Sequence, residues 1–222
     1  QIHYDWGLVI AGYLSSHASL GITYGGSLRI PYGLSHAPVG FNELHGLYTA
    51  HDSSWGTRPK PLGGYVIMYM NGAVDWSAKL VKIVPDSSCE AETAVASFAT
   101  KGTCFIRGLL RFHQRPVAAA TPMLGDNEAM HTLVTNEGAT YRTRYYERAT
   151  LLIKRAVLML LLHPLLVATQ YMLADMFTKA LEKSTFVRFR NVMMNCNGSA
   201  RDTLHRAVFS LHGEARRLAD RL

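Results

Sequence analysis

Cysteine is scarce in this sequence, with only Cys89, Cys104 and Cys196 among 222 residues. None of the three belongs to a C-x-x-C pair, and an odd count argues against a framework of disulfide bonds. No cluster of histidines and cysteines has the ligand spacing of a zinc site. We therefore expect three reduced thiols in an intracellular protein, cytoplasmic or nuclear.

Long hydrophobic runs are lacking as well. The most apolar stretch is Ala156–Ala168, which is interrupted by His163 and Pro164. It is shorter than the roughly 20 residues that a membrane-spanning helix needs, so we interpret it as a buried strand and expect no membrane partner. The sequence starts with Gln1 and shows no basic-then-apolar leader, which suggests a piece of a longer polyprotein.

Acidic residues are outnumbered, because 16 Asp and Glu stand against 23 Lys and Arg, a formal net charge of +7. A positive excess suits a polyanionic partner, since Lys and Arg contacts to phosphates release condensed counterions. A mildly basic surface without such a partner is an equally open interpretation. Hydrophobic residues make up 48% of the chain, which is typical of a globular protein with a sizeable core.

From Gly46 onward, the hydrophobic pattern predicts three antiparallel strands, a long helix, and then strands alternating with helices. Asn71 and Gly72 are predicted to form the hairpin turn, because both tolerate positive φ. Pro164 lacks a backbone N–H, so its strand is expected at a sheet edge. The predicted strands cover 47–52, Tyr65–Met70, Ala73–Ala78, Pro122–Gly125 and Leu158–Val167, and the predicted helices cover Asp86–Arg111, Asn127–Val134, Arg142–Ala156, Tyr171–Ala180 and Thr185–Met194.

This order of elements implies an α/β fold with a mixed five-stranded sheet, three antiparallel strands and then parallel strands, and flanking helices. We place this domain at residues 41–195. Residues 1–40 predict a short helix near Trp6–Leu14 and a strand near Gly21–Tyr24, and residues 196–222 predict an amphipathic, Arg-rich helical extension.

Four acidic residues stand at strand ends or helix starts, where ligands of mixed α/β sheets gather. Asp52 lies in or at the end of the first strand and Asp126 follows the fourth, while Glu92 lies in the long helix and Asp175 opens a later one. Four crowded carboxylates repel one another unless cations neutralise them, and their oxygens suit Mg²⁺ or Mn²⁺. Two such ions can activate a water and stabilise the leaving oxygen of a phosphodiester. Taken singly, each acid is more often a surface group or a helix cap.

Seven segments around these acids carry motifs in a fixed order. They are L-G-I-T-Y-G-G from Leu20, H-D-S-S-W-G from His51, G-Y-V-I from Gly64 with G-A-V-D-W-S-A-K from Gly72, S-S-C-E-A-E from Ser87, G-D-N-E-A from Gly125, R-T-R from Arg142 and L-A-D-M-F-T-K from Leu173. The first looks like the segment that joins a reverse transcriptase to a nuclease. The others are similar to the S-D-A-D-W-A-G, G-Y-V-F with G-G-A-V-S-W-x-S-K, S-S-T-E-A-E, C-D-N-Q-S-A, A-R-T-K-H and L-A-D-I-F-T-K motifs of the copia-type retrotransposon ribonuclease H family.

The resemblance covers roughly residues 17–195 and implies a ribonuclease H-like fold. It implies that Asp52, Glu92, Asp126 and Asp175 bind two ions, Mg²⁺ or Mn²⁺, and that the enzyme cuts the RNA strand of an RNA–DNA hybrid. Residues 1–40 would connect to the reverse transcriptase portion of the same polyprotein, which is the expected protein partner. The resemblance also implies that the protein is found inside the cell, including in virus-like particles. Glu90 is the rival for the helix position; we prefer Glu92 because it directly precedes the apolar face of the helix.

Hybrid recognition would rest on 2′-OH contacts and groove shape rather than base sequence. Five residues are candidates for this contact: Arg142, Arg144, Arg148, Lys154 and Trp55. A solvated helix face is an equal alternative for the basic stretch, which also includes Arg155. Core packing is favoured over sugar contact for Trp55 and Trp76.

The sequence departs from the family at several polar positions. Ser54 replaces the second aspartate of the first motif, Tyr145 replaces a histidine, and no histidine precedes Asp175 in its turn. A catalytically decayed or repurposed nucleic-acid-binding module therefore remains the alternative function. An integrase-like strand transferase is a third, disfavoured by the four-acid pattern.

Overall fold

The structure is a computed structural model that describes residues 2–56, 60–136 and 146–196. Its elements follow one another in the order that the sequence predicts from the first strand onward. They are α1 (Ile2–Ser16), the 3₁₀ helix η1 (Phe41–Leu44), β1 (Tyr48–Ser53), β2 (Leu62–Tyr69), β3 (Gly72–Leu80), α2 (Ser88–Phe112), β4 (Thr121–Gly125), α3 (Glu128–Thr135), α4 (Glu147–Leu158), β5 (Leu162–Leu166), the 3₁₀ helices η3 (Thr169–Tyr171) and η4 (Leu173–Phe177), and α5 (Lys183–Met193).

The five strands form one sheet in the order β3-β2-β1-β4-β5. β1 pairs antiparallel with β2, and β2 antiparallel with β3, whereas β4 runs parallel to both β1 and β5. This is the mixed five-stranded sheet of the ribonuclease H-like fold, so the predicted fold class is confirmed. Pro164 lies in β5 at the sheet edge, as expected for a residue that cannot donate to both neighbours.

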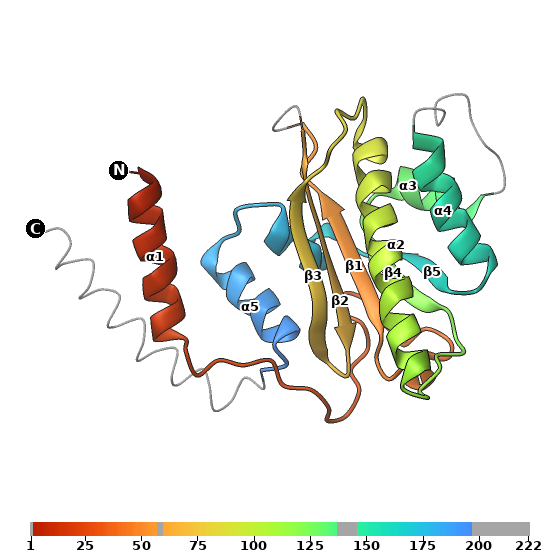
Figure 1. Ribbon diagram of the computed structural model, residues 1–222, viewed down its shortest axis with the longest axis horizontal. Coiled ribbons are helices and arrows are strands. Elements are labelled where there is room, and N and C mark those ends of the chain that lie inside the picture. Colours follow the sequence, from red (N-terminus) through yellow and green to blue (C-terminus); the bar gives the residue numbers. More distant parts are fainter. Residues whose placement is uncertain (1, 57–59, 137–145, 197–222) are drawn as a thin grey trace, which may run out of the picture.

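Helices cover both faces of the sheet (Figure 1). α2, α3 and α4 lie on one face, with α2 packed on β1 and β2, and α1 and α5 lie on the other side. The main core cluster includes Val66, Ile67 and Met68 of β2, all at most 1% exposed. Each fully buried aliphatic side chain of this kind contributes about 1.5–3 kcal/mol to the stability of the frame that positions the site.

The long helix α2 begins at Ser88, two residues after the predicted start at Asp86. Ser87 is its N-cap, and the Ser87 hydroxyl accepts a hydrogen bond from Glu90 N at 3.1 Å. The carboxylate of Glu90 in turn accepts a bond from Asp86 N at 2.9 Å, which satisfies a second backbone donor at the start of the helix. This double cap holds the first turns of α2 in place, and Glu92 follows within them.

The hairpin turn between β2 and β3 differs from the prediction by one residue. Met70 and Asn71 form it, with φ of 48° and 68°, and Gly72 is already the first residue of β3. The Asn71 side chain accepts from Arg29 N and donates to the carbonyls of Gly25 and Ser27, each at 3.0 Å. These bonds to the preceding loop fix Asn71 at the turn position.

Two other predicted elements are wrong. Residues 21–24 form no strand; they run past the tip of the hairpin, where the Tyr24 hydroxyl donates to Ala73 O at 2.8 Å. The Tyr171–Ala180 helix is replaced by η3 and η4, because this segment turns tightly between β5 and α5.

The apolar stretch Ala156–Ala168 is only partly a strand. Its first residues end α4, the chain turns at Leu160 with a φ of 54°, and the strand itself starts at Leu162. Among the described residues, none of the helices combines the length and hydropathy needed to cross a membrane. The structure shows no disulfide bond at Cys89, Cys104 or Cys196, all within its described residues. The predicted helix of residues 196–222 lies beyond the described part of the chain, apart from Cys196.

Gly64 allows η4 to approach the sheet. It pairs with Asp52 across β1 and β2, and a Cβ atom added to it would lie 2.5 Å from Phe177 Cβ and 3.3 Å from Ala174 O. Only a residue without a side chain leaves room for both. The packing of η4, which carries Asp175, therefore depends on this glycine.

We expect Gly64→Ala to lower the free energy of unfolding by about 1–3 kcal/mol, the usual cost of overpacking a core. Urea denaturation monitored by circular dichroism measures it. Gly108→Ala is the matched control, because nothing lies within 4 Å of a Cβ at this position of α2, and alanine favours a helix. Equal stability of Gly64→Ala and wild type would show that η4 does not need this close approach.

Candidate active site

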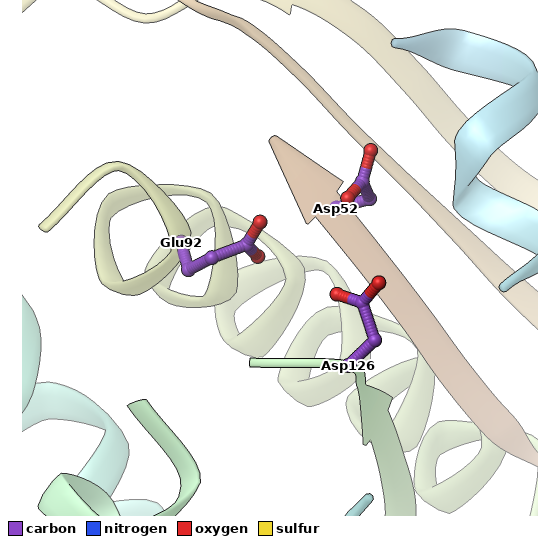
Figure 2. A group of neighbouring side chains, drawn as sticks. All are labelled: Asp52, Glu92 and Asp126. Carbon is purple, nitrogen blue, oxygen red and sulfur yellow. The ribbon is translucent and has the colours of Figure 1, made fainter. Parts of the chain in front are cut away.

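Three carboxylates converge at the carboxyl ends of β1 and β4 (Figure 2). Asp52 lies in β1, Asp126 directly follows β4, and Glu92 projects from the early turns of α2. One oxygen from each of the three lies within 4.8 Å of the others. β1 and β4 are parallel neighbours, so their carboxyl ends meet at the same edge, and the start of α2 passes over it.

The two carboxylate oxygens of Glu92 differ in their hydrogen bonds. Its Oε1 accepts hydrogen bonds from both the backbone N and the hydroxyl of Ser53, each at 2.9 Å. Its Oε2 is buried without a hydrogen-bond partner in the described structure. His51 Nδ1 lies 3.5 Å from that oxygen, a contact that does not meet hydrogen-bond geometry, and both ring nitrogens of His51 are also unsatisfied.

A buried carboxylate oxygen without a donor is costly. Glu92 Oε2 belongs to a side chain that points toward Asp52 and Asp126, two further acceptors (Figure 2). Hard divalent cations such as Mg²⁺ or Mn²⁺ bind carboxylate oxygens of this kind. The donor set of Asp52, Glu92 and Asp126 therefore fits a metal ion.

Asp175 reaches the site from a different side and is held by a lysine. It lies in η4, and its Oδ1 is 2.8 Å from Lys179 Nζ. The same ammonium lies 3.3 Å from Asp52 Oδ1. Thr178 donates a hydrogen bond to the other oxygen of Asp52. Asp175 thus neighbours Asp52 through Lys179 and is not part of the group formed by Asp52, Glu92 and Asp126.

Asp126 has its own polar partner. Its Oδ2 accepts a hydrogen bond from the Thr169 hydroxyl at 2.8 Å, which ties the end of β4 to η3. Asn127, the next residue, caps α3 by accepting from Met130 N at 2.9 Å. The carboxylate of Asp126 is therefore fixed between a strand end and a helix start.

Burial and crowding raise the pKa of two of the acids. The pKa of Asp52 is raised to about 7, mainly because the carboxyl is buried and then because of the Glu92 charge, while Thr178 and Lys179 oppose the shift. The pKa of Asp175 is also raised, with burial as the main cause and Lys179 opposing it. Burial lowers the pKa of Lys179, but the hydrogen bond to Asp175 and the surrounding carboxylates outweigh it, so the net shift is upward.

The structure distinguishes the two glutamates of α2 by their partners. Glu92 points toward Asp52 and Asp126, whereas the carboxylate of Glu90 is engaged with Asp86 N at the helix start. Glu90 lies in the first turn of α2, where its carboxylate accepts from the backbone ahead of the helix. The geometry thus favours Glu92 as the third member of the acidic group.

The candidate nucleic-acid contacts are only partly visible. Arg142 and Arg144 lie outside the described residues, Arg148 is exposed on α4, and Lys154 is half-buried. Trp55 is 46% exposed, and its ring nitrogen donates to Pro85 O at 3.3 Å. Trp76, in the edge strand β3, is 51% exposed, so the favoured core packing of both tryptophans is wrong.

No role of His51, Thr178 or Lys179 is predicted from the sequence. Lys179 follows Asp175 by four residues, a spacing at which opposite charges meet on a helical turn, and this signal was available. His51 carried no such signal, because it occupies the place of a serine in the resembling motif and its contact with Glu92 joins two distant segments.

Neither a protein-family model nor a curated protein sequence matches the chain. Similar solved structures include ribonuclease H1 from the archaeon Halobacterium salinarum, at 14% identity and a TM-score of 0.45 over 60% of this chain and 93% of that one. The N-terminal ribonuclease H domain of a Mycobacterium tuberculosis protein has 9% identity and a TM-score of 0.45 over 64% and 94%. LC11 ribonuclease H1, in complex with an RNA/DNA hybrid, has 14% identity and a TM-score of 0.45 over 60% and 93%. Sheet order and strand directions identify the fold here.

Proposed function

We propose that this chain is a metal-dependent endoribonuclease that cleaves the RNA strand of RNA–DNA hybrids. The observation that supports it most directly is the convergence of Asp52, Glu92 and Asp126 within 4.8 Å at the edge of a ribonuclease H-like sheet. The buried Glu92 Oε2 that lacks a partner supports a cation there. We propose Asp175 as the fourth ligand. Asp52 would bind one ion together with Glu92 and Asp126 and a second ion together with Asp175.

The surrounding residues hold the proposed ligands in fixed orientations. Ser53 fixes Glu92, Thr169 fixes Asp126, and Thr178 fixes Asp52. Such outer hydrogen bonds commonly keep ligands oriented and tune the affinity for the metal. When bound, two Mg²⁺ or Mn²⁺ ions would supply an activated water and neutralise the charge on the leaving 3′ oxygen.

The motifs that resemble copia-type polyproteins suggest the setting of this activity. We propose a ribonuclease H domain that acts during reverse transcription, next to the reverse transcriptase portion of the same polyprotein, inside the cell or its virus-like particles. Arg142, Arg144, Arg148 and Lys154 would contact phosphates of the hybrid, and the exposed face of Trp55 would contact a sugar.

A non-catalytic module that binds hybrids is the second candidate. The ion pairs of Lys179 with Asp52 and Asp175 favour it, because they neutralise two of the four acids without a metal.

A cleavage assay separates the two candidates. The RNA strand of a hybrid carries a label, and the chain is added with Mg²⁺, with Mn²⁺ or with a chelator. We expect cleavage of the hybrid with either ion and none with the chelator, and no cleavage of an RNA–RNA or DNA–DNA duplex of the same sequence. Hybrid binding without cleavage under any of these conditions would favour the non-catalytic module.

A further inference from the structure

We infer that the Lys179 ammonium occupies the position of a second cation between Asp52 and Asp175. The chain would therefore bind one divalent cation at Asp52, Glu92 and Asp126, and accept a second only when Lys179 withdraws. This inference rests on the proposed role of the acidic group as a metal site.

Lys179 is well placed for this role. Its Nζ lies 2.8 Å from Asp175 Oδ1 and 3.3 Å from Asp52 Oδ1, so one positive charge bridges two carboxylates from different elements. Its backbone N donates to Asp175 O at 3.0 Å, which keeps the base of the side chain next to its partner. The side chain is 38% exposed, so its end can move into solvent without breaking the core.

The two halves of the site differ in how their charge is balanced. On the side of Asp52 and Asp175, Lys179 supplies a cation and Thr178 supplies a hydrogen bond. On the other side, Glu92 Oε2 is buried without a hydrogen-bond partner, with His51 Nδ1 3.5 Å away, and the Glu92 side chain points toward Asp126 (Figure 2). A first cation is therefore attracted to the side of Glu92 and Asp126, because the ion pairs that the structure shows for Lys179 go to Asp52 and Asp175.

A second dication next to Asp175 would meet the positive charge of Lys179. Two positive charges that share the same pair of carboxylates repel each other strongly in a partly buried site, where the effective dielectric constant is lower than that of water. Binding there requires Lys179 to leave both carboxylates. Replacing Lys179 by an uncharged side chain of similar length should therefore strengthen binding at this position without changing its oxygen ligands.

Manganese titration of the complete 222-residue chain without nucleic acid tests this. Free Mn²⁺ is followed by electron paramagnetic resonance, and heat by calorimetry. We expect one tight equivalent for wild type and two for Lys179→Met, with the second ion bound at least ~10-fold more tightly than in wild type because a neighbouring positive charge is gone.

Three further variants make the result specific. Lys101→Met removes an exposed lysine of α2 and should bind as wild type does. Lys179→Arg keeps the charge and should also bind one tight equivalent. Lys179→Met combined with Asp175→Asn should return to one equivalent, because the second ion loses a ligand. Circular dichroism checks that each variant is folded.

The outcomes separate this inference from the proposed function. One equivalent of equal affinity in wild type and Lys179→Met would overturn the role of Lys179 and leave the metal site of Asp52, Glu92 and Asp126 standing. Two tight equivalents in wild type would also overturn it. The absence of any binding in every folded variant would overturn both the inference and the proposed metal site.

Discussion

Asp126→Asn is expected to abolish metal-dependent cleavage of an RNA–DNA hybrid and to leave hybrid binding largely intact. Asparagine has nearly the same shape, keeps one oxygen for the Thr169 hydroxyl and loses the negative charge of one of three converging carboxylates. Loss of a single preorganised electrostatic group in an active site commonly costs about 10²–10³-fold in rate, and a lost metal ligand adds to this. Single-turnover cleavage measures the rate, and fluorescence anisotropy with a labelled hybrid measures binding.

The matched control for this substitution is Asp86→Asn. Asp86 is exposed ahead of α2, and only its backbone N–H is engaged with Glu90. The control makes the same chemical change outside the acidic group, so its cleavage rate should stay close to that of wild type. Full activity of Asp126→Asn, measured beside this control, would contradict the proposed catalytic role of the acidic group.

Without metal, the stability of the protein is expected to fall as pH rises from about 4 to above 7. The pKa of Asp52 is raised from 3.8 to about 7 in the folded chain, so the folded state keeps a proton that the unfolded state has already released. The stabilisation from this proton is fully present below the unfolded pKa and is lost as pH rises through the folded one. The upward pKa shift of Asp175 acts in the same direction.

Thermal unfolding at pH 5 and pH 8, with and without Mg²⁺, measures this effect. We expect a lower Tm at pH 8 without metal and a larger increase on adding Mg²⁺ at pH 8 than at pH 5, because the metal binds the deprotonated carboxylates. Asp52→Asn should show a weaker dependence on both pH and Mg²⁺. A wild-type Tm that rises from pH 5 to pH 8 without metal, with Asp52→Asn behaving alike, would contradict the expectation.

Several elements could be predicted because local chemistry sets them. The start of α2 was predicted to within two residues, because the N-cap bond of Ser87 that sets it spans only three residues. Pro164 restricts its strand to an edge by lacking a donor. The antiparallel pairing of β2 and β3 follows from a tight turn whose residues have positive φ. The shift of that turn to Met70 and Asn71 could not be predicted, because the decisive bonds of Asn71 go to a loop more than 40 residues earlier.

The conformation of the segment around Asp175 could not be predicted from local sequence. Its apolar spacing predicts an α-helix, yet it forms the 3₁₀ helix η4, whose Phe177 packs against the open face of Gly64. That contact joins β2 to a segment far along the chain. Local propensity does not contain it, so tertiary packing decided the conformation of this turn.

The sequence by itself determined the order of the strands and helices from β1 to β5 and singled out four acids as candidate ligands, because strand periodicity and motif spacing are local properties of the chain. Only the tertiary structure decided how those acids are divided. Asp52, Glu92 and Asp126 form one group, while Asp175 reaches Asp52 through Lys179. The physical reason is that these distances depend on how η4 and α2 pack against the end of β1, and such packing joins residues too far apart in the sequence for any local pattern to record.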